Sequence, residues 1–216
     1  MSIATMILGE SGTGKTTSLR NMPAADTLLI QAVAKPLPFR APGWTLRTKE
    51  NPTGNILRTD CADTIIAAMH KTQRDVIVLD DFQYVLANEF MRRSNETGFG
   101  KFTDIGKAAW SILMEASVLA EHKRVYILAH TDRTDDGRVK CKTIGKLLDE
   151  KITVEGLLTI VLRTHVRDGN YWFSTRNSGS DTVKSPMGMF EDEFIPNDLD
   201  QVDAAIAAFY APAAAA

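Results

Sequence analysis

The sequence predicts an α/β fold with a mostly parallel sheet flanked by helices and extended by an antiparallel hairpin. Short apolar runs recur along the chain and alternate with segments of helical periodicity, which is the pattern of β-α units. The first run ends in a glycine-rich loop, which is typical of a buried parallel strand. Two later runs flank the turn Arg-Asp-Gly-Asn at residues 167–170 and predict the hairpin.

Each expected element follows from its local pattern. The strands are expected where β-branched and apolar residues cluster, at 3–8, 27–30, 56–58, 76–79, 125–129, 157–166 and 171–175. The helices are expected at 16–21, 62–71, 82–93, 103–121 and 199–210. Asp60 is the expected cap of the second helix, and Asn197 or Asp198 of the last. The polar segments 94–101 and 131–143 are expected to be loops.

Length and composition indicate one domain over residues 1–210, followed by a disordered tail at 211–216. The formal charge of −2 excludes a surface that is basic overall, so any polyanion contact must be local. Cys61 and Cys141 are expected to be free thiols, the latter on the surface. No apolar stretch approaches the roughly 20 residues needed to span a bilayer, and no basic segment precedes the first strand. We therefore expect a cytoplasmic protein without a membrane partner.

A phosphate-binding loop is the strongest functional motif of the chain. Residues 9–16 match G-x-x-x-x-G-K-[ST] at every fixed position, between a predicted strand and a predicted helix. The glycines allow successive N–H groups to point at one anion, and the helix N-terminus adds its positive dipole end. Lys15 is expected to reach the β- and γ-phosphates, and the Thr16 hydroxyl to ligate magnesium. The predicted cofactors are therefore ATP and Mg²⁺, bound by Gly9, Glu10, Ser11, Gly12, Thr13, Gly14, Lys15, Thr16 and Thr17.

Polar residues at two strand ends complete the predicted site. The apolar run 76–79 ends in Asp80, which is the Walker B pattern and predicts a magnesium ligand beside Thr16. Asp81 has two equal interpretations: it orients the attacking water as general base, or it caps the helix that begins at residue 82. His130 follows the strand 125–129, at the sheet edge that presents residues to ligands. It could sense the γ-phosphate, and a purely structural role is the alternative.

The order of these motifs resembles the RecA-like ATPase core, and more closely the phage-encoded RecA-like recombinase and single-strand annealing ATPases. The resemblance runs from the phosphate-binding loop to about residue 190. It is carried by GESGTGKTT (9–17), KPLPF (35–39), VLDDFQY (78–84), NEFMRR (88–93), IGKLLDEK (144–151) and GSDTVKSP (179–186).

The resemblance implies an ATPase, slow or DNA-dependent, that binds single-stranded DNA in phage recombination by annealing or strand exchange. It implies self-association into a filament or ring, with a single-strand-binding protein as a further possible partner. Lys184 resembles a catalytic residue that reaches the γ-phosphate of a neighbouring subunit. One departure concerns the segment after the second strand, residues 31–33, which lacks the catalytic glutamate usual in the family. Water activation would then fall to Asp81, to Glu10, or to no efficient base.

RecA-like cores present two loops to the DNA strand, and by position these are segments 92–101 and 131–143. The first combines basic side chains with aromatic rings, and the second combines basic with acidic side chains. The implied DNA-binding residues are Arg92, Arg93, Phe99, Lys101, Arg133, Arg138, Lys140 and Lys142. From the residues alone, solvated surface loops are the favoured interpretation of both segments, and only the resemblance reverses this.

Two other functions remain open from the sequence. A small P-loop phosphotransferase would need an arginine-rich lid, whereas the segment after His130 mixes acids with bases. A non-hydrolysing scaffold would use ATP only to order its loops. An AAA+ motor is disfavoured because the chain ends in a hairpin and one helix in place of a helical lid.

Overall fold

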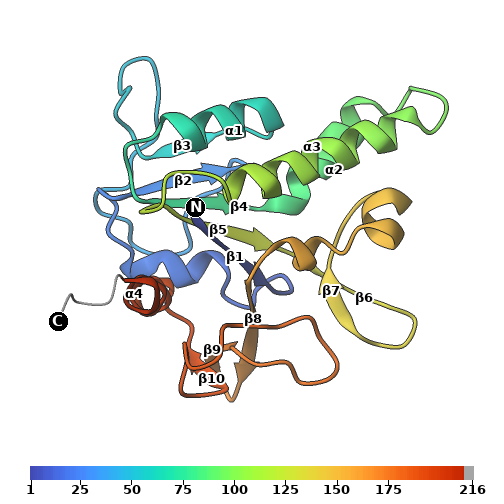
Figure 1. Ribbon diagram of the computed structural model, residues 1–216. Helices are drawn as coiled ribbons and strands as arrows, with labels where there is room; N and C mark the ends of the chain where they lie inside the picture. The colour runs from blue at the N-terminus through green and yellow to red at the C-terminus, as the bar shows by residue number, and fades with distance from the viewer. Residues whose placement is uncertain (212–216) are drawn as a thin grey trace.

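The computed structural model describes residues 1–211 and has one eight-stranded sheet as its centre (Figure 1). Its strands are β1 (Ile3–Leu8), β2 (Thr27–Gln31), β3 (Ile56–Arg58), β4 (Val76–Asp80), β5 (Arg124–Ala129), β8 (Ile160–Arg167), β9 (Asn170–Ser174) and β10 (Phe194–Pro196). They lie in the order β10-β9-β8-β1-β5-β4-β2-β3. The six strands from β8 to β3 are parallel, and β9 and β10 add antiparallel pairs. The predicted mostly parallel sheet with an antiparallel extension is confirmed.

Helices cover both faces of this sheet, so the fold has three layers (Figure 1). On one face lie α1 (Ala62–Lys71), α2 (Phe82–Arg92) and α3 (Gly100–Ala116), and on the other lie α4 (Leu199–Tyr210) and the short 3-10 helix η1 (Thr16–Asn21). Successive side chains along a strand point to opposite faces of the sheet and pack against the helices on that face. In β1, Met6 and Leu8 pack with the first set of helices, whereas Ile7 packs with the second. Burial on both faces explains why the strands read as continuous apolar runs.

The hairpin between β8 and β9 forms where the sequence predicts it. Its two-residue turn is Asp168-Gly169, with φ of 51° and 75°. Both values lie in the left-handed region that a type I′ turn requires and that Asp-Gly readily adopts. The hairpin places β9 beside the strand that adjoins β1, which brings Tyr171 toward the loop that follows β1.

The segment 131–143 is not the open loop that the sequence predicts. It forms a second, two-stranded sheet from β6 (Thr131–Arg133) and β7 (Val139–Cys141), which we call the β6–β7 hairpin. The turn at Gly137, with φ of 82°, allows the two strands to pair. Cys141 is buried, because β7 packs against η3 (Val154–Leu157), which follows the short π-helix η2 (Leu147–Lys151). The expectation of a surface thiol at Cys141 is therefore wrong.

Two helix boundaries also differ from expectation. The residue at the cap position of α1 is Cys61, because the Asp60 carboxylate turns away to bind Asn88 and Arg92. The third α-helix begins and ends earlier than its apolar periodicity suggests, at Gly100 and Ala116. At α4, Asp198 is the cap, and its carboxylate accepts from the Asp200 N–H.

Within residues 1–211, no helix is both long and apolar enough to cross a membrane. The predicted tail lies outside the described residues, apart from Ala211.

Candidate functional site

The loop between β1 and η1 is shaped by its glycines. A Cβ on Gly9 would lie 2.0 Å from the Thr164 hydroxyl oxygen and 2.7 Å from that of Thr13, so no larger residue fits there. Gly12 and Gly14 have φ of 78° and 97°, in the left-handed region that glycine adopts without strain. η1 is only a six-residue 3-10 helix. Its dipole is therefore weaker than that of a long helix, and the loop N–H groups and Lys15 carry most of the potential for anion binding.

Lys15 lies across this loop as a buried cation. Its side-chain ammonium donates to the carbonyl oxygens of Gly9 at 2.8 Å and Glu10 at 3.0 Å. The residue is only 6% exposed, and burial lowers the pKa of Lys15 against the opposing effect of Asp81 and Asp80. The neighbouring carboxylates therefore favour the charged ammonium that a phosphate would need.

Thr16 and Asp80 meet although 64 residues separate them in the sequence. The Thr16 hydroxyl lies 3.1 and 3.2 Å from the two carboxylate oxygens of Asp80 at the end of β4. Burial, followed by repulsion from Asp81, raises the pKa of Asp80 to about 6. This hydroxyl–carboxylate pair is the arrangement that the sequence predicts for a magnesium site. A bound Mg²⁺ usually takes only one or two carboxylates and completes its shell with water and phosphate oxygens.

Asp81 occupies the cap position of α2, but its carboxylate makes no cap hydrogen bond. One of its oxygens, Oδ2, lies 3.2 Å from His130 Nε2 and 3.4 Å from the Lys35 ammonium. The other, Oδ1, is buried without a hydrogen-bond partner among the described residues. Burial raises the pKa of Asp81, but the His130 hydrogen bond and the charge of Lys15 outweigh it, so the net pKa is lowered. Of the two interpretations, side-chain capping is wrong, and Asp81 is an ionised member of the site.

These residues surround a cavity of about 370 Å³ at the carboxyl edge of the sheet, within the range typical of ligand sites. Its lining residues are Ser11, Gly12, Gly14, Lys15, Thr16, Thr17, Lys35, Pro36, Pro38, Asp81, Tyr84, His130 and Tyr171. The sequence predictions did not include Lys35, Tyr84 or Tyr171 as site residues. Lys35 lies in one of the stretches that carry the resemblance, which was the available signal, whereas only folding brings Tyr171 to the site.

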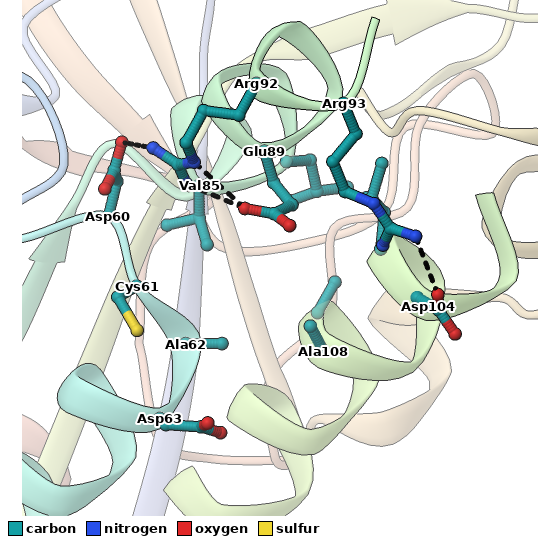
Figure 2. Close-up of a pocket in the computed structure, with 13 residues that line it drawn as sticks. Asp60, Cys61, Ala62, Asp63, Val85, Glu89, Arg92, Arg93, Asp104 and Ala108 are labelled. Atoms are coloured by element: carbon teal, nitrogen blue, oxygen red, sulfur yellow. Dashed lines mark hydrogen bonds and ion pairs between the residues drawn. The ribbon is translucent and has the colours of Figure 1, made fainter. Parts of the chain in front are cut away.

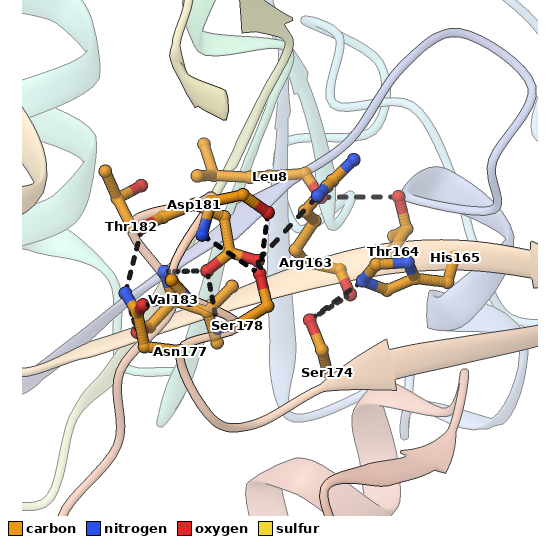
Figure 3. Close-up of polar contacts among 12 residues, drawn as sticks. Leu8, Arg163, Thr164, His165, Ser174, Asn177, Ser178, Asp181, Thr182 and Val183 are labelled. Carbon is orange, nitrogen blue, oxygen red and sulfur yellow. Dashed lines mark hydrogen bonds and ion pairs between the residues drawn. The ribbon is translucent and has the colours of Figure 1, made fainter. Parts of the chain in front are cut away.

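Thr164 connects the glycine-rich loop at residues 9–16 to β8, and Figure 3 shows its bond to Leu8 of β1. Its hydroxyl donates to the carbonyl of Leu8 at 3.3 Å and lies 2.6 Å from the hydroxyl of Thr13. Thr164 is buried. These contacts connect the base of the loop to β8, which pairs with β1 on the side opposite β5.

The segment around Asp181, also drawn in Figure 3, is held to β8 by the buried Asp181 carboxylate. The Asp181 carboxylate lies 3.7 Å from the Arg163 guanidinium and accepts from the Ser178 hydroxyl at 2.7 Å and the Val183 N–H at 3.1 Å. Lys184 follows, and its backbone pairs with that of Val161 in both directions. Its side chain does not line the cavity and makes no ion pair with any residue from 1 to 211.

The basic residues of segment 92–101 are engaged within the chain, as Figure 2 shows for Arg92 and Arg93. Arg92 pairs with Asp60 and Glu89, and Arg93 with Glu96 and Asp104. All of these residues except Glu96 line a groove of about 530 Å³ between α1, α2 and α3. The ammonium of Lys101 donates to three backbone carbonyls and lies over the rings of Phe90 and Phe102, whereas Phe99 is 86% exposed.

Of the four basic residues predicted to bind DNA in segment 131–143, only one forms an ion pair with another described residue. Lys140 pairs with Asp149 at 2.5 Å. Arg133, Arg138 and Lys142 are exposed and form no ion pair with any other described residue. The hairpin starts directly after His130, and the Lys142 N–H donates to the His130 carbonyl at 2.8 Å.

No group of three metal-ligating side chains occurs in the part of the chain that the structure describes, so Thr16 and Asp80 remain the candidate metal pair. No protein-family model matches the chain, and no curated protein matches it significantly. The geometry of the site therefore carries the functional interpretation.

Proposed function

We propose that this protein binds ATP with Mg²⁺ and hydrolyses it. The observation that carries the proposal is the contact of the Thr16 hydroxyl with both carboxylate oxygens of Asp80, at 3.1 and 3.2 Å. It joins the loop and β4 at a point where one ion could bind both. Thr16 and Asp80 would hold the Mg²⁺, which would supply positive charge that neutralises the phosphates.

The surrounding residues fit a triphosphate. Two cations, Lys15 and Lys35, face the same cavity, and the glycine loop offers backbone N–H groups for phosphate oxygens. The acidic pair Asp80 and Asp81 lies beside them and would repel a bare polyanion. A metal ion at Thr16 and Asp80 removes this repulsion, which supports the requirement for magnesium.

Asp81 is the residue placed to orient water. His130 and Lys35 hold its Oδ2, which leaves the unpartnered Oδ1 available to accept a hydrogen bond from a water molecule. The lowered pKa of Asp81, in which the His130 hydrogen bond overcomes burial, makes it a weak proton acceptor. We therefore expect Asp81 to position water more than to deprotonate it, and turnover to be slow.

Paired variants of the two aspartates test this proposal. Asp80→Asn should abolish the tightening of ATP binding by Mg²⁺, measured by titration with a fluorescent ATP analogue. Asp81→Asn should retain binding and slow phosphate release by about 10²-fold, because misplacing the attacking water by an ångström costs about that much. Asp135→Asn, on the exposed turn of the hairpin, is the control. Unchanged magnesium dependence in Asp80→Asn would contradict the metal assignment.

The same assays separate the alternative functions. Tight ATP binding without phosphate release in the wild type would favour the non-hydrolysing scaffold. Formation of ADP without free phosphate, and only in the presence of an acceptor molecule that receives the phosphoryl group, would favour a phosphotransferase.

The further proposal is RecA-like action on single-stranded DNA, in annealing or strand exchange, supported by the order of motifs along the chain. The three unpaired cations of the β6–β7 hairpin are the stronger candidates for phosphate contacts. Arg92 and Arg93 would first have to leave their carboxylate partners. The hairpin also adjoins His130, so a nucleotide that contacts His130 could order it.

A salt series separates these two sets of residues. Each phosphate contact on a single strand contributes about −0.7 to the slope of log affinity against log salt. Replacing Arg133, Arg138 and Lys142 by glutamine should flatten the slope by about 2. Replacing Arg92 and Arg93 should leave it unchanged. The reverse result would place the DNA on segment 92–101, and absence of binding at low salt would remove the recombination proposal.

We also propose that Lys184 acts in a neighbouring subunit of a filament or ring, because its ammonium has no ion-pair partner in the described chain and does not line its own cavity. Mixing inactive Lys15→Ala with inactive Lys184→Ala protein should restore partial ATPase activity. An assembled mixture without recovery would refute the shared site.

A further inference from the structure

The side-chain amide of Asn197 is buried without a partner beside the phosphate-binding loop. Asn197 is 3% exposed, and neither its Nδ2 nor its Oδ1 makes a hydrogen bond with any residue described. An amide can make about four hydrogen bonds, and a buried polar group without partners destabilises the fold. Such a group is a candidate for satisfaction by a ligand.

The position of this amide is tightly defined. A Cβ on Gly14 would lie 3.0 Å from Asn197 Oδ1 and 3.0 Å from the ring carbon Cδ1 of Tyr171. The Asn197 N–H donates to the Tyr171 carbonyl at 3.1 Å, and its own carbonyl accepts from Arg20 at 2.5 Å. Asn197 thus lies where β9, η1 and the start of α4 meet, with its amide against Gly14 and next to the Tyr171 ring.

Tyr171 connects this amide to the cavity. It lines the cavity together with Gly14 and is 47% exposed. It lies at the solvent-exposed start of β9, whereas Asn197 itself is not among the residues that line the cavity. A ligand in the cavity reaches the Asn197 amide only if the Tyr171 ring moves aside, and the moved ring would present an aromatic face for stacking.

We propose that Asn197 and Tyr171 form the nucleobase subsite of the cavity, and that the base they select is adenine. This inference rests on the proposed binding of a nucleoside triphosphate. The Tyr171 ring stacks on the base, and the amide accepts from the exocyclic amino group N6 and donates to N7. On the same edge guanine presents two acceptors, O6 and N7, which leaves the amide oxygen facing an acceptor without a hydrogen bond.

Competition binding with ATP, GTP and inorganic tripolyphosphate tests the subsite. The wild type should bind ATP about 5- to 150-fold more tightly than GTP, which corresponds to one unmade buried hydrogen bond. Asn197→Leu should reduce ATP affinity to that of GTP and leave tripolyphosphate affinity unchanged. Tyr171→Phe should keep ATP affinity, whereas Tyr171→Ala should weaken both nucleotides about 5- to 150-fold through lost stacking.

Stability measurements distinguish the subsite from a packing role. Asn197→Ala, which adds no bulk beside Gly14, serves if the leucine variant does not fold. It removes an amide without partners, so its loss of stability should be smaller than that of Asn55→Ala. Asn55 is equally buried, but its amide bonds to Thr45, Ala24 and Gly43. Asn55→Ala should keep the ATP preference.

The outcomes separate the two proposals. Tripolyphosphate that binds while ATP and GTP bind equally would overturn the adenine subsite alone, as would an unchanged ATP preference in both Asn197 variants. A wild type that binds neither tripolyphosphate nor ATP would overturn both the subsite and the proposed function.

Discussion

Lys15→Met tests the phosphate-binding loop with little change in shape. Methionine keeps most of the buried volume of lysine and removes the ammonium. The structure shows that Lys15 also serves the fold, because its ammonium bonds to the carbonyls of Gly9 and Glu10. A loss of stability is therefore expected in addition to a loss of binding, and the two must be measured separately.

The expected magnitude follows from the contacts. Two charge-assisted hydrogen bonds to phosphate oxygens contribute about 3 kcal/mol at the low end of their range, or about 150-fold in affinity. ATP at 100 times its dissociation constant should stabilise the wild type by about 2.7 kcal/mol. That corresponds to roughly 5–11 °C in Tm for a domain of this size. At the same concentration the variant should gain about 0.3 kcal/mol, or roughly 1 °C.

Lys123→Met is the matched control. Lys123 is also 6% exposed, and its ammonium also donates to two backbone carbonyls, of Thr72 at 3.0 Å and Arg74 at 2.9 Å. It does not line the cavity. Thermal unfolding with and without ATP and Mg²⁺ should show lower stability for both variants, by about 1–3 kcal/mol. Only Lys15→Met should lose the ATP-dependent shift, and a full shift in that variant would refute the assignment of the loop.

Three further predictions concern the fold. Asp203→Ala should destabilise the protein by about 3–5 kcal/mol in denaturant titration, because it leaves the Arg124 guanidinium and the Tyr126 hydroxyl without their shared acceptor. Gly9→Ala should prevent ATP binding by displacing the loop from Thr164, and intact binding would contradict the close approach. With a thiol reagent, Cys61 should react in the native protein and Cys141 only after unfolding, because burial raises the pKa of the Cys141 thiol and the chain covers it.

Much of the fold was predictable because local patterns determine it. Apolar runs and the Asp-Gly turn predicted seven strands of the large sheet and the hairpin, though not β6, β7 or β10, and α1 spans the predicted residues 62–71. The spacing of glycines, lysine and threonine predicted a tight glycine-rich turn between β1 and η1, and its binding of phosphate stays a prediction. These features depend on neighbours along the chain, so the sequence alone contains them.

Contacts between distant segments were decided only by the tertiary structure. The sequence left Asp81 between two roles, and its partners Lys35 and His130 come from different strand ends that the parallel sheet brings to one edge. Asn197 was expected only as a helix cap, yet its unpartnered amide lies beside Gly14, 183 positions earlier in the chain. Likewise, charge counting could not show which cations already have partners. Folding decides this, because an ion pair depends on a few ångströms of separation, which residue spacing along the chain does not specify.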